Sequence, residues 1–206
     1  MHLSEQLDVP LRDRNSMLLA AGFAPAFEER AIDAPEMAPV REALDKILTG
    51  HEPYPALVVD RWWNLQAANQ SIGMFIGEVP AHLMEPPVNV LRVSLHPEGM
   101  GSRILNYGEW RAHLVDRLRR QVALTADERL SRLLKEIAGY PGATDEIHGA
   151  GAEIAVPLRF DAGGRELTFF STLATFGTAV DITLAELAIE AFFPADRATA
   201  DYLLGN

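Results

Sequence analysis

The stretch from Tyr54 to Asn69 constrains the fold more than any other part of the sequence. It reads Tyr-Pro-Ala-Leu-Val-Val-Asp-Arg-Trp-Trp-Asn-Leu-Gln-Ala-Ala-Asn, so an apolar run ends at Asp60, turns, and resumes before Asn69. This layout predicts a strand, a tight turn and a second strand that opens into a helix, with Asn69 at the helix N-cap. The sheet of this protein therefore begins with a pair of neighbouring strands.

Helical patterns lie on both sides of this strand pair. Residues 40–48 carry an apolar face at helical spacing, and the prolines and glycines of residues 70–100 favour several short helices. Residues 104–124 have a long apolar stripe typical of one extended helix. Thr125 and Glu128 match a capping box, which predicts that another helix begins there.

Three strand patterns close the sequence. Residues 154–160 alternate apolar and polar side chains, and Pro157 favours an edge position for that strand. The Asp-Ala-Gly-Gly turn at residues 161–164 then predicts a hairpin into a strand over residues 167–176, and the last strand covers residues 187–193. Two strands, then helices, then three strands predict an α+β fold with an antiparallel sheet of about five strands covered by helices.

Composition excludes several classes of protein. The chain of 206 residues is 48% hydrophobic, which suffices for one substantial core. A net charge of −11 disfavours direct contact with DNA or an anionic membrane, since phosphate contacts require a basic surface. The absence of cysteine excludes disulfides and thiolate metal sites. No apolar run reaches the roughly 18 residues of a membrane span, so a soluble cytoplasmic protein is expected.

No catalytic pattern is recognisable. The histidines stand at positions 2, 51, 82, 96, 113 and 148 and form no His-Glu-x-x-His pair, and no nucleophile elbow or phosphate-binding loop is present. We therefore expect no enzyme, no cofactor and no metal. The carboxylates Asp181, Glu186 and Glu190 are interpreted as a solvated face or as turn anchors. A cleft that joined Asp181 to a histidine would favour an enzyme instead.

Six stretches together point to a known family. They are residues 51–61 (His-Glu-Pro-Tyr-Pro-Ala-Leu-Val-Val-Asp-Arg), 89–97 (Asn-Val-Leu-Arg-Val-Ser-Leu-His-Pro), 110–120 (Trp-Arg-Ala-His-Leu-Val-Asp-Arg-Leu-Arg-Arg), 156–159 (Val-Pro-Leu-Arg), 175–187 (Thr-Phe-Gly-Thr-Ala-Val-Asp-Ile-Thr-Leu-Ala-Glu-Leu) and 193–199 (Phe-Pro-Ala-Asp-Arg-Ala-Thr). In these stretches the chain resembles the MmyB-like transcription regulators, a group of XRE-type helix-turn-helix regulators. The resemblance implies a PAS-like ligand-binding domain, a fatty-acid-like or other apolar ligand, and a homodimer.

The same resemblance implies a division of the chain. Residues 1–25 resemble the last helices of a helix-turn-helix domain, residues 26–36 form a linker, and residues 37–206 form the PAS-like domain. The recognition helix would precede this sequence, so DNA is expected as a partner only through that missing part. The alternative is that residues 2–21 form a helical arm that packs on the main core.

One helix face carries the strongest candidates for ligand contact. Trp110, His113 and Arg117 follow one another at spacings of three and four residues, so they share a face. Arg117 is suited to pair with a ligand carboxylate, with His113 as a second donor. The alternative places His113 in the core as a satisfied histidine and pairs Arg117 with a carboxylate of the protein.

A second set of candidates lies earlier in the chain. Arg92 and His96 are polar residues within an apolar run, and a buried charge requires an acidic partner, a backbone carbonyl or an anionic ligand head. A helix-to-helix ion pair would satisfy Arg92 equally well. Asn106 is interpreted as a local helix cap or a polar anchor, with a weaker claim to ligand contact.

The apolar wall of a pocket would come from Trp63, Phe169 and Leu173. Such residues build a plain core more often than a pocket, so two functions remain open. The first is the ligand-sensing and dimerisation part of a bacterial transcription regulator, which binds an apolar small molecule such as a fatty acid. The second is a dimerisation or protein-interaction module with a solid core and no small ligand.

Overall fold

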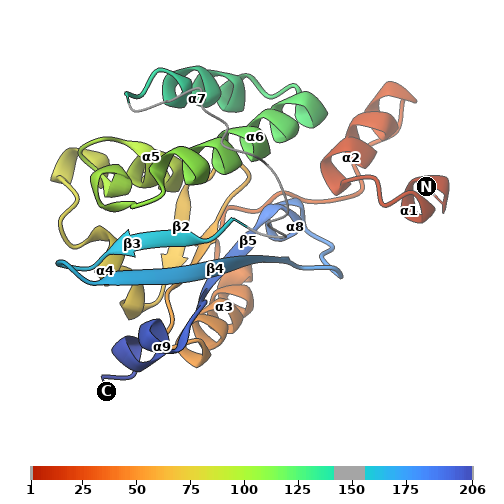
Figure 1. Ribbon diagram of the computed structural model, residues 1–206. Coiled ribbons are helices and arrows are strands. Elements are labelled where there is room, and N and C mark those ends of the chain that lie inside the picture. Colours follow the sequence, from red (N-terminus) through yellow and green to blue (C-terminus); the bar gives the residue numbers. More distant parts are fainter. Residues whose placement is uncertain (1, 142–155, 206) are drawn as a thin grey trace.

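A five-stranded antiparallel sheet forms the centre of the protein, in a computed structural model that describes residues 2–141 and 156–205 (Figure 1). The strands are β1 (Ala56–Val59), β2 (Leu65–Ala68), β3 (Leu158–Asp161), β4 (Glu166–Thr175) and β5 (Ala188–Pro194), and they lie in the order β2-β1-β5-β4-β3. All neighbouring pairs are antiparallel. With the helices inserted between β2 and β3, this is the PAS-like α+β arrangement predicted from the sequence.

Nine α-helices and four short 3-10 helices are present in the described residues. The α-helices are α1 (His2–Gln6), α2 (Leu11–Ala20), α3 (Ala38–Gly50), α4 (Gly73–Ile76), α5 (Val90–Leu95), α6 (Tyr107–Thr125), α7 (Glu128–Ala138), α8 (Ile182–Glu186) and α9 (Arg197–Leu203). The 3-10 helices are η1 (Pro35–Met37), η2 (Gln70–Ile72), η3 (Ala81–Leu83) and η4 (Met100–Arg103). The predicted division of residues 70–100 into short helices is therefore confirmed.

The helices cover both faces of the sheet. In Figure 1, α5, α6 and α7 lie on one side, which we call the inner face, and α3 lies on the other, the outer face. The larger core cluster fills the inner side, whereas a smaller cluster joins α3 to β1 and β5. β5 is the middle strand and is covered on both faces. Its successive side chains therefore point in turn into the inner and the outer layer.

The turn between β1 and β2 is held by Asp60. Its carboxylate accepts hydrogen bonds from the backbone N–H groups of Trp62 (2.8 Å) and Asn64 (2.9 Å). Trp63 adopts a left-handed conformation with φ 67°, which is unusual for a residue other than glycine. Asn69 stands at the N-cap position of η2 as predicted, but its amide side chain bonds to the backbone of Ala56 instead of capping the helix.

The start of α7 differs from the prediction. The capping residue of α7 is Asp127, whose carboxylate accepts from the backbone of Arg129 and Leu130, while Thr125 is the last residue of α6. The Thr125 capping box is therefore wrong, because Ala126 turns left-handed (φ 51°) and moves the helix start by two residues. β3 is an edge strand, as Pro157 predicted, and Ile154 lies outside the described residues.

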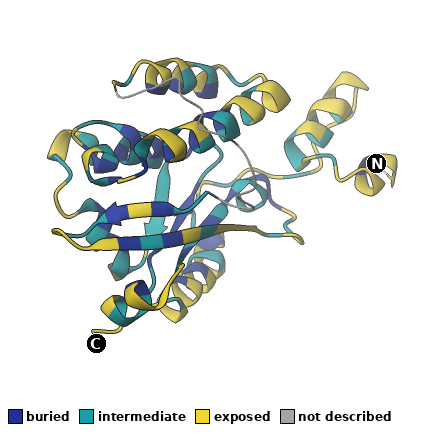
Figure 2. Cartoon of the chain, in the orientation of Figure 1, coloured by how far each residue is buried: buried dark blue, intermediate teal, exposed yellow. Residues whose placement is uncertain are grey.

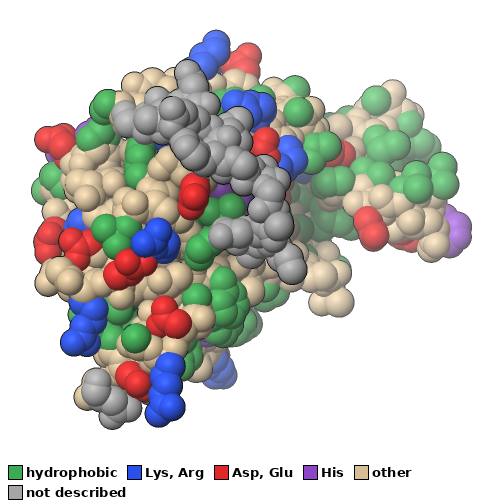
Figure 3. All heavy atoms as spheres, in the orientation of Figure 1, with side chains coloured by type: hydrophobic (Ala, Val, Ile, Leu, Met, Phe, Trp, Pro, Cys, Tyr) green, Lys and Arg blue, Asp and Glu red, His purple; other side chains and the backbone are tan. Residues whose placement is uncertain are grey.

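Residues 2–23, which we call the N-terminal arm, project from this body (Figure 2). The arm exposes Leu3 (71%), Leu7 (66%) and Phe23 (65%), and Figure 3 shows hydrophobic side chains gathered on it. α2 touches the body at α8. Among the described helices, none combines the length and the apolar character that a membrane crossing requires.

Candidate functional site

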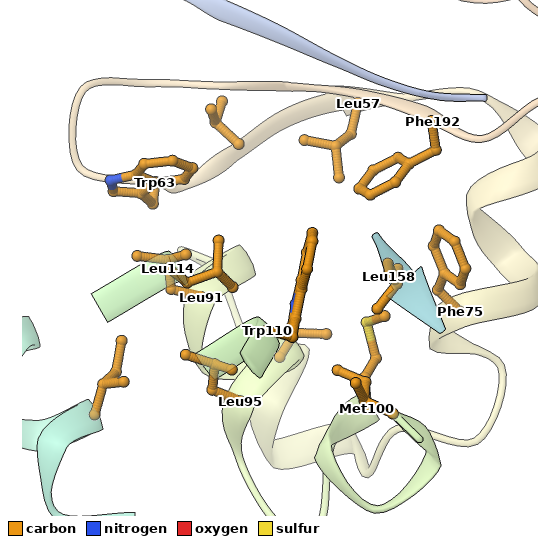
Figure 4. Close-up of a cluster of buried hydrophobic side chains, with 14 of the residues drawn as sticks. Leu57, Trp63, Phe75, Leu91, Leu95, Met100, Trp110, Leu114, Leu158 and Phe192 are labelled. Carbon is orange, nitrogen blue, oxygen red and sulfur yellow. The ribbon is translucent and has the colours of Figure 1, made fainter. Parts of the chain in front are cut away.

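A small cavity lies between the inner face of the sheet and helices α4, α5 and α6. Its volume is about 60 Å³. Figure 4 shows much of its apolar wall, which includes Leu57, Phe75, Leu91, Trp110, Leu114 and Phe192. Among the lining residues that belong to the described part of the chain, only Ser94 and Glu190 carry a hydroxyl or a charged group. The cavity therefore has an apolar wall with two polar points.

Glu190 is the unexpected member of this wall. It lies on β5 between Leu57 of β1 and Leu173 of β4, and only 6% of it is exposed. Burial raises the pKa of its carboxyl, while Arg117 and a hydrogen bond from Ser171 act in the opposite direction. The interpretation of Glu190 as part of a solvated face is wrong, because α6 covers that side of β5.

The apolar neighbours of Glu190 give the sequence signal that was overlooked. Ala188 and Phe192 share its face of β5, and they pack against the same inner core cluster. A strand with apolar side chains on both faces is typical of a strand buried on both sides. Asp181, by contrast, does act as a turn anchor, since its carboxylate caps α8 and accepts from Arg30 at 2.9 Å.

Ser94 and Trp110 form the second polar point. The indole N–H of Trp110 donates to the Ser94 hydroxyl at 3.1 Å, so the buried indole nitrogen has a partner. The ring of His113 stacks on Trp110 with 5.9 Å between centroids. Burial lowers the pKa of His113, and Arg117 and Arg120 lower it further. His113 is therefore neutral at neutral pH and lies behind the cavity wall.

Arg117 lies next to the cavity but outside its lining. Its guanidinium is 4.5 Å from the ring centre of Trp63, whose indole N–H donates to Gln121 at 2.8 Å. Burial lowers the pKa of Arg117, and the neighbouring Glu190 opposes that effect. Within residues 2–141 and 156–205, no carboxylate oxygen lies within 4.0 Å of the Arg117 nitrogens. Arg117 is thus a half-buried cation whose nearest described partner is an aromatic ring.

Arg92 and His96 lie away from the cavity. Arg92 forms two hydrogen bonds of 2.7 Å with Glu136 of α7, and the pair is exposed to solvent. His96 lies near His82 and Glu98, and one ligand atom from each residue falls within 4.8 Å of the others. This group offers the donor types of a zinc site. The backbone N–H of Glu98 already donates to His96 Nδ1 at 3.1 Å, however, and both His82 and Glu98 are exposed.

The remaining candidates have structural positions. Asn106 precedes α6, donates to the Pro157 carbonyl at 2.8 Å and accepts from the backbone of Arg159, so it joins α6 to β3. Phe169 is buried against Phe75 with 5.4 Å between ring centroids. Leu173 is 43% exposed, although it occupies the inner-face position opposite Glu190. The structure brings Trp63, Trp110, His113 and Arg117 together, and leaves Arg92, His96 and Asn106 outside that group.

A second, more polar hollow of about 290 Å³ lies between residues 29–32, the β1–β2 turn and α8. Two of its charged side chains, those of Arg61 and Glu186, are paired with each other. Glu186 accepts from Arg12 of the arm at 2.7 Å and from Arg61 of the turn at 3.1 Å. Arg61 also pairs with Asp127 at 3.0 Å, and Asp127 accepts from the indole of Trp62. The hollow is thus bordered by an ion-pair network that joins the arm to the body of the protein.

Comparison with known proteins identifies a family. The model of the MmyB-like transcription regulator ligand binding domain matches residues 40–204. A solved structure of the Rhodobacter sphaeroides LOV protein is 13% identical, with 78% of this chain and 71% of that chain covered and a TM-score of 0.36. The RsLOV d2 variant is 16% identical at the same coverage, with a TM-score of 0.37. TM-scores this low support no inference about function. Among curated proteins, none matches the chain.

Proposed function

We propose that this chain, which belongs to the MmyB-like transcription regulators through its ligand-binding domain, senses an apolar small molecule such as a fatty acid. The observation that carries the proposal is the apolar cavity, with its few polar groups, between the sheet and α6. A saturated chain buried there gains about 0.8 kcal/mol for each methylene removed from water. The proposal assigns no reaction to the chain.

The size of the cavity makes binding a conformational event. At about 60 Å³ it is far smaller than typical ligand pockets, which measure roughly 300–1,000 Å³. A chain-like ligand must therefore displace lining side chains. Met84 and Met100 are suited to that displacement, because the unbranched thioether chain adapts to many shapes. Both lie in the segment of short helices between β2 and α6.

A route from the cavity to the arm supports a signalling role. Trp110 lines the cavity and belongs to α6, the same helix that holds Trp63 through Gln121. Gln121 also donates to the backbone carbonyl of Arg61 at 2.8 Å, and Arg61 reaches the arm through Glu186. A ligand that displaces α6 thus changes the position of the arm, provided that it binds the two arrangements with different affinity.

Dimerisation and DNA binding complete the proposal. The exposed apolar side chains of the arm are suited to burial against a second copy of the chain. DNA would be contacted by the helix-turn-helix domain of the family, since the net charge of −11 disfavours phosphate contacts by this part. A transcription regulator of bacteria acts in the cytoplasm. Light scattering at several protein concentrations tests the dimer, and a monomer at all of them contradicts it.

The test of ligand binding is native mass spectrometry of the purified protein, followed by lipid extraction and titration with fatty acids. We expect a bound amphiphile or saturable binding. The variant Leu57→Phe places a larger ring in the cavity and should abolish binding, whereas Leu124→Phe, on an 88% exposed residue, should leave it unchanged. An unliganded mass that no apolar compound alters would favour the alternative of a solid interaction module.

A further inference from the structure

Among the described residues that line the cavity, Glu190 is the only acidic one, and its position is central to the sheet. It lies on the middle strand, with Leu57 opposite on β1 and Leu173 opposite on β4. The carboxyl is buried, and within the described residues no basic nitrogen lies within 4.0 Å of it. An ionised carboxylate in such a place carries a large desolvation cost without a direct ion pair.

The groups that face Glu190 offer little compensation for a negative charge. From α6 comes Arg117, which stacks on Trp63 and carries Asp116 and Arg120 as its charged neighbours along the helix. From β4 comes the hydroxyl of Ser171, and β1 contributes only the apolar Leu57. His113, also on α6, is neutral above its usual titration range because burial lowers its pKa.

We propose that Glu190 binds the polar end of the ligand as an uncharged carboxyl group, and that the cavity accordingly takes amphiphiles with a neutral head: an alcohol, or a fatty acid in its protonated form. This inference rests on the proposed function and specifies its ligand. The neutral carboxyl donates its O–H to an oxygen of the ligand, and its carbonyl oxygen can accept a hydrogen bond from the O–H of the ligand in return. Two carboxyl groups cannot both be ionised in one apolar cavity.

The inference assigns a different role to Arg117 from the one the sequence suggested. An ionised fatty acid bound by Arg117 would place a second carboxylate near the buried carboxyl of Glu190, which interacts with the same guanidinium. Arg117 is absent from the cavity lining, whereas Glu190 is part of it. The head group of a ligand in the cavity therefore contacts Glu190 and does not reach Arg117 directly.

Calorimetric titration with dodecanol and with laurate, which have the same chain length, tests the inference between about pH 7.5 and about pH 8.5, above the usual histidine pKa of about 6.5, from which burial lowers the pKa of His113. Laurate affinity should fall about tenfold for each pH unit, because only its protonated form binds. Dodecanol affinity should change by less than about twofold while Glu190 keeps its proton.

Two variants separate the roles of charge and hydrogen bonding. Glu190→Gln keeps a neutral hydrogen-bonding group and should leave dodecanol affinity within about twofold, whereas Glu190→Leu should weaken it by about two- to tenfold. Circular dichroism confirms folding of both. Laurate binding that is independent of pH and is lost in Arg117→Gln would overturn the inference but keep the proposed function. Failure of both ligands to bind any form of the protein would overturn both.

Discussion

The two faces of the sheet differ in how tightly they are packed. On the outer face one helix of thirteen residues, α3, places Leu44 and Leu48 against Val58 and Ile189, all of which are at most 9% exposed. On the inner face the same strand β5 carries Glu190, which borders a cavity. Ile189 thus belongs to the tightly packed outer layer, whereas Glu190, the next residue of the strand, belongs to the inner layer that contains the cavity.

The difference follows from the length of the covering elements. A helix of three or more turns presents continuous ridges that interdigitate with a sheet. The inner face beneath α6 is closed partly by η2, α4, η3, α5 and η4, none of which exceeds six residues. Short segments can move separately from one another. A ligand could therefore enter on the inner face, where several short segments take the place of one long helix.

The largest expected effect lies on the solid side. Leu48→Ala should lower the free energy of unfolding by about 2–5 kcal/mol, because the outer layer cannot collapse around the lost side chain. Urea denaturation measures it, with Leu124→Ala as an exposed control expected within about 0.5 kcal/mol of wild type. A loss below about 1 kcal/mol would show that the outer layer is no more rigid than the inner one.

On the inner face, the stability of the protein should depend on pH through Glu190. Burial raises the pKa of Glu190, so the native state keeps a proton that the unfolded chain releases at about pH 4.3. Stability should therefore fall as pH rises from there to the raised pKa, by up to about 1.4 kcal/mol per pH unit. Glu190→Gln should remove this slope in urea denaturation at several pH values. Equal slopes in both proteins would mean that Glu190 is ionised in the native state.

A smaller effect is expected at the second polar point of the cavity. Ser94→Ala removes the acceptor of the Trp110 indole N–H and should cost about 1–3 kcal/mol, since a buried donor is left without a partner. Ser102→Ala, at an exposed serine, serves as the control. An unchanged midpoint in Ser94→Ala would indicate that the inner face adjusts readily enough to supply another partner.

The smallest effect concerns the network between the arm and the body. Glu186→Gln weakens the contacts with Arg12 and Arg61 and should cost about 0.5–1 kcal/mol. Limited proteolysis should cleave residues 21–34 faster than in wild type, and added salt should reduce the difference. Glu42→Gln, which affects only an exposed pair with Lys46, should change nothing. Equal cleavage rates in wild type and Glu186→Gln would show that these ion pairs do not hold the arm on the body.

Local patterns predicted the fold well. The strand pair around Asp60 and the edge position after Pro157 depend on neighbouring residues and on backbone chemistry, and both are found. The start of α7 was misplaced because Asp127 and Thr125 are equally good caps in sequence, and the left-handed Ala126 decides between them. The choice between two candidate N-cap residues depends on the backbone conformation between the two helices, which local propensity does not predict.

The candidate site was harder to predict because its partners are distant in sequence. Arg92 finds Glu136, 44 residues later, so its pairing depends on how α5 and α7 meet. The charge of Glu190 favours a solvated position, whereas its same-face neighbours Ala188 and Phe192 are apolar, and the helices over the inner face make it buried. A sequence identifies which side chains require partners, but tertiary packing decides which partners they receive.

The three tryptophans of the chain occupy three positions along the route from cavity to arm. Trp110 borders the cavity, Trp63 lies under the Arg117 guanidinium, and Trp62 donates to Asp127 in the ion-pair network. The three indoles have different hydrogen-bond acceptors, so variants that retain one tryptophan and replace the other two by phenylalanine would report on each position separately. The protein thus carries its own set of fluorescent reporters, with which the order of events after ligand addition can be timed.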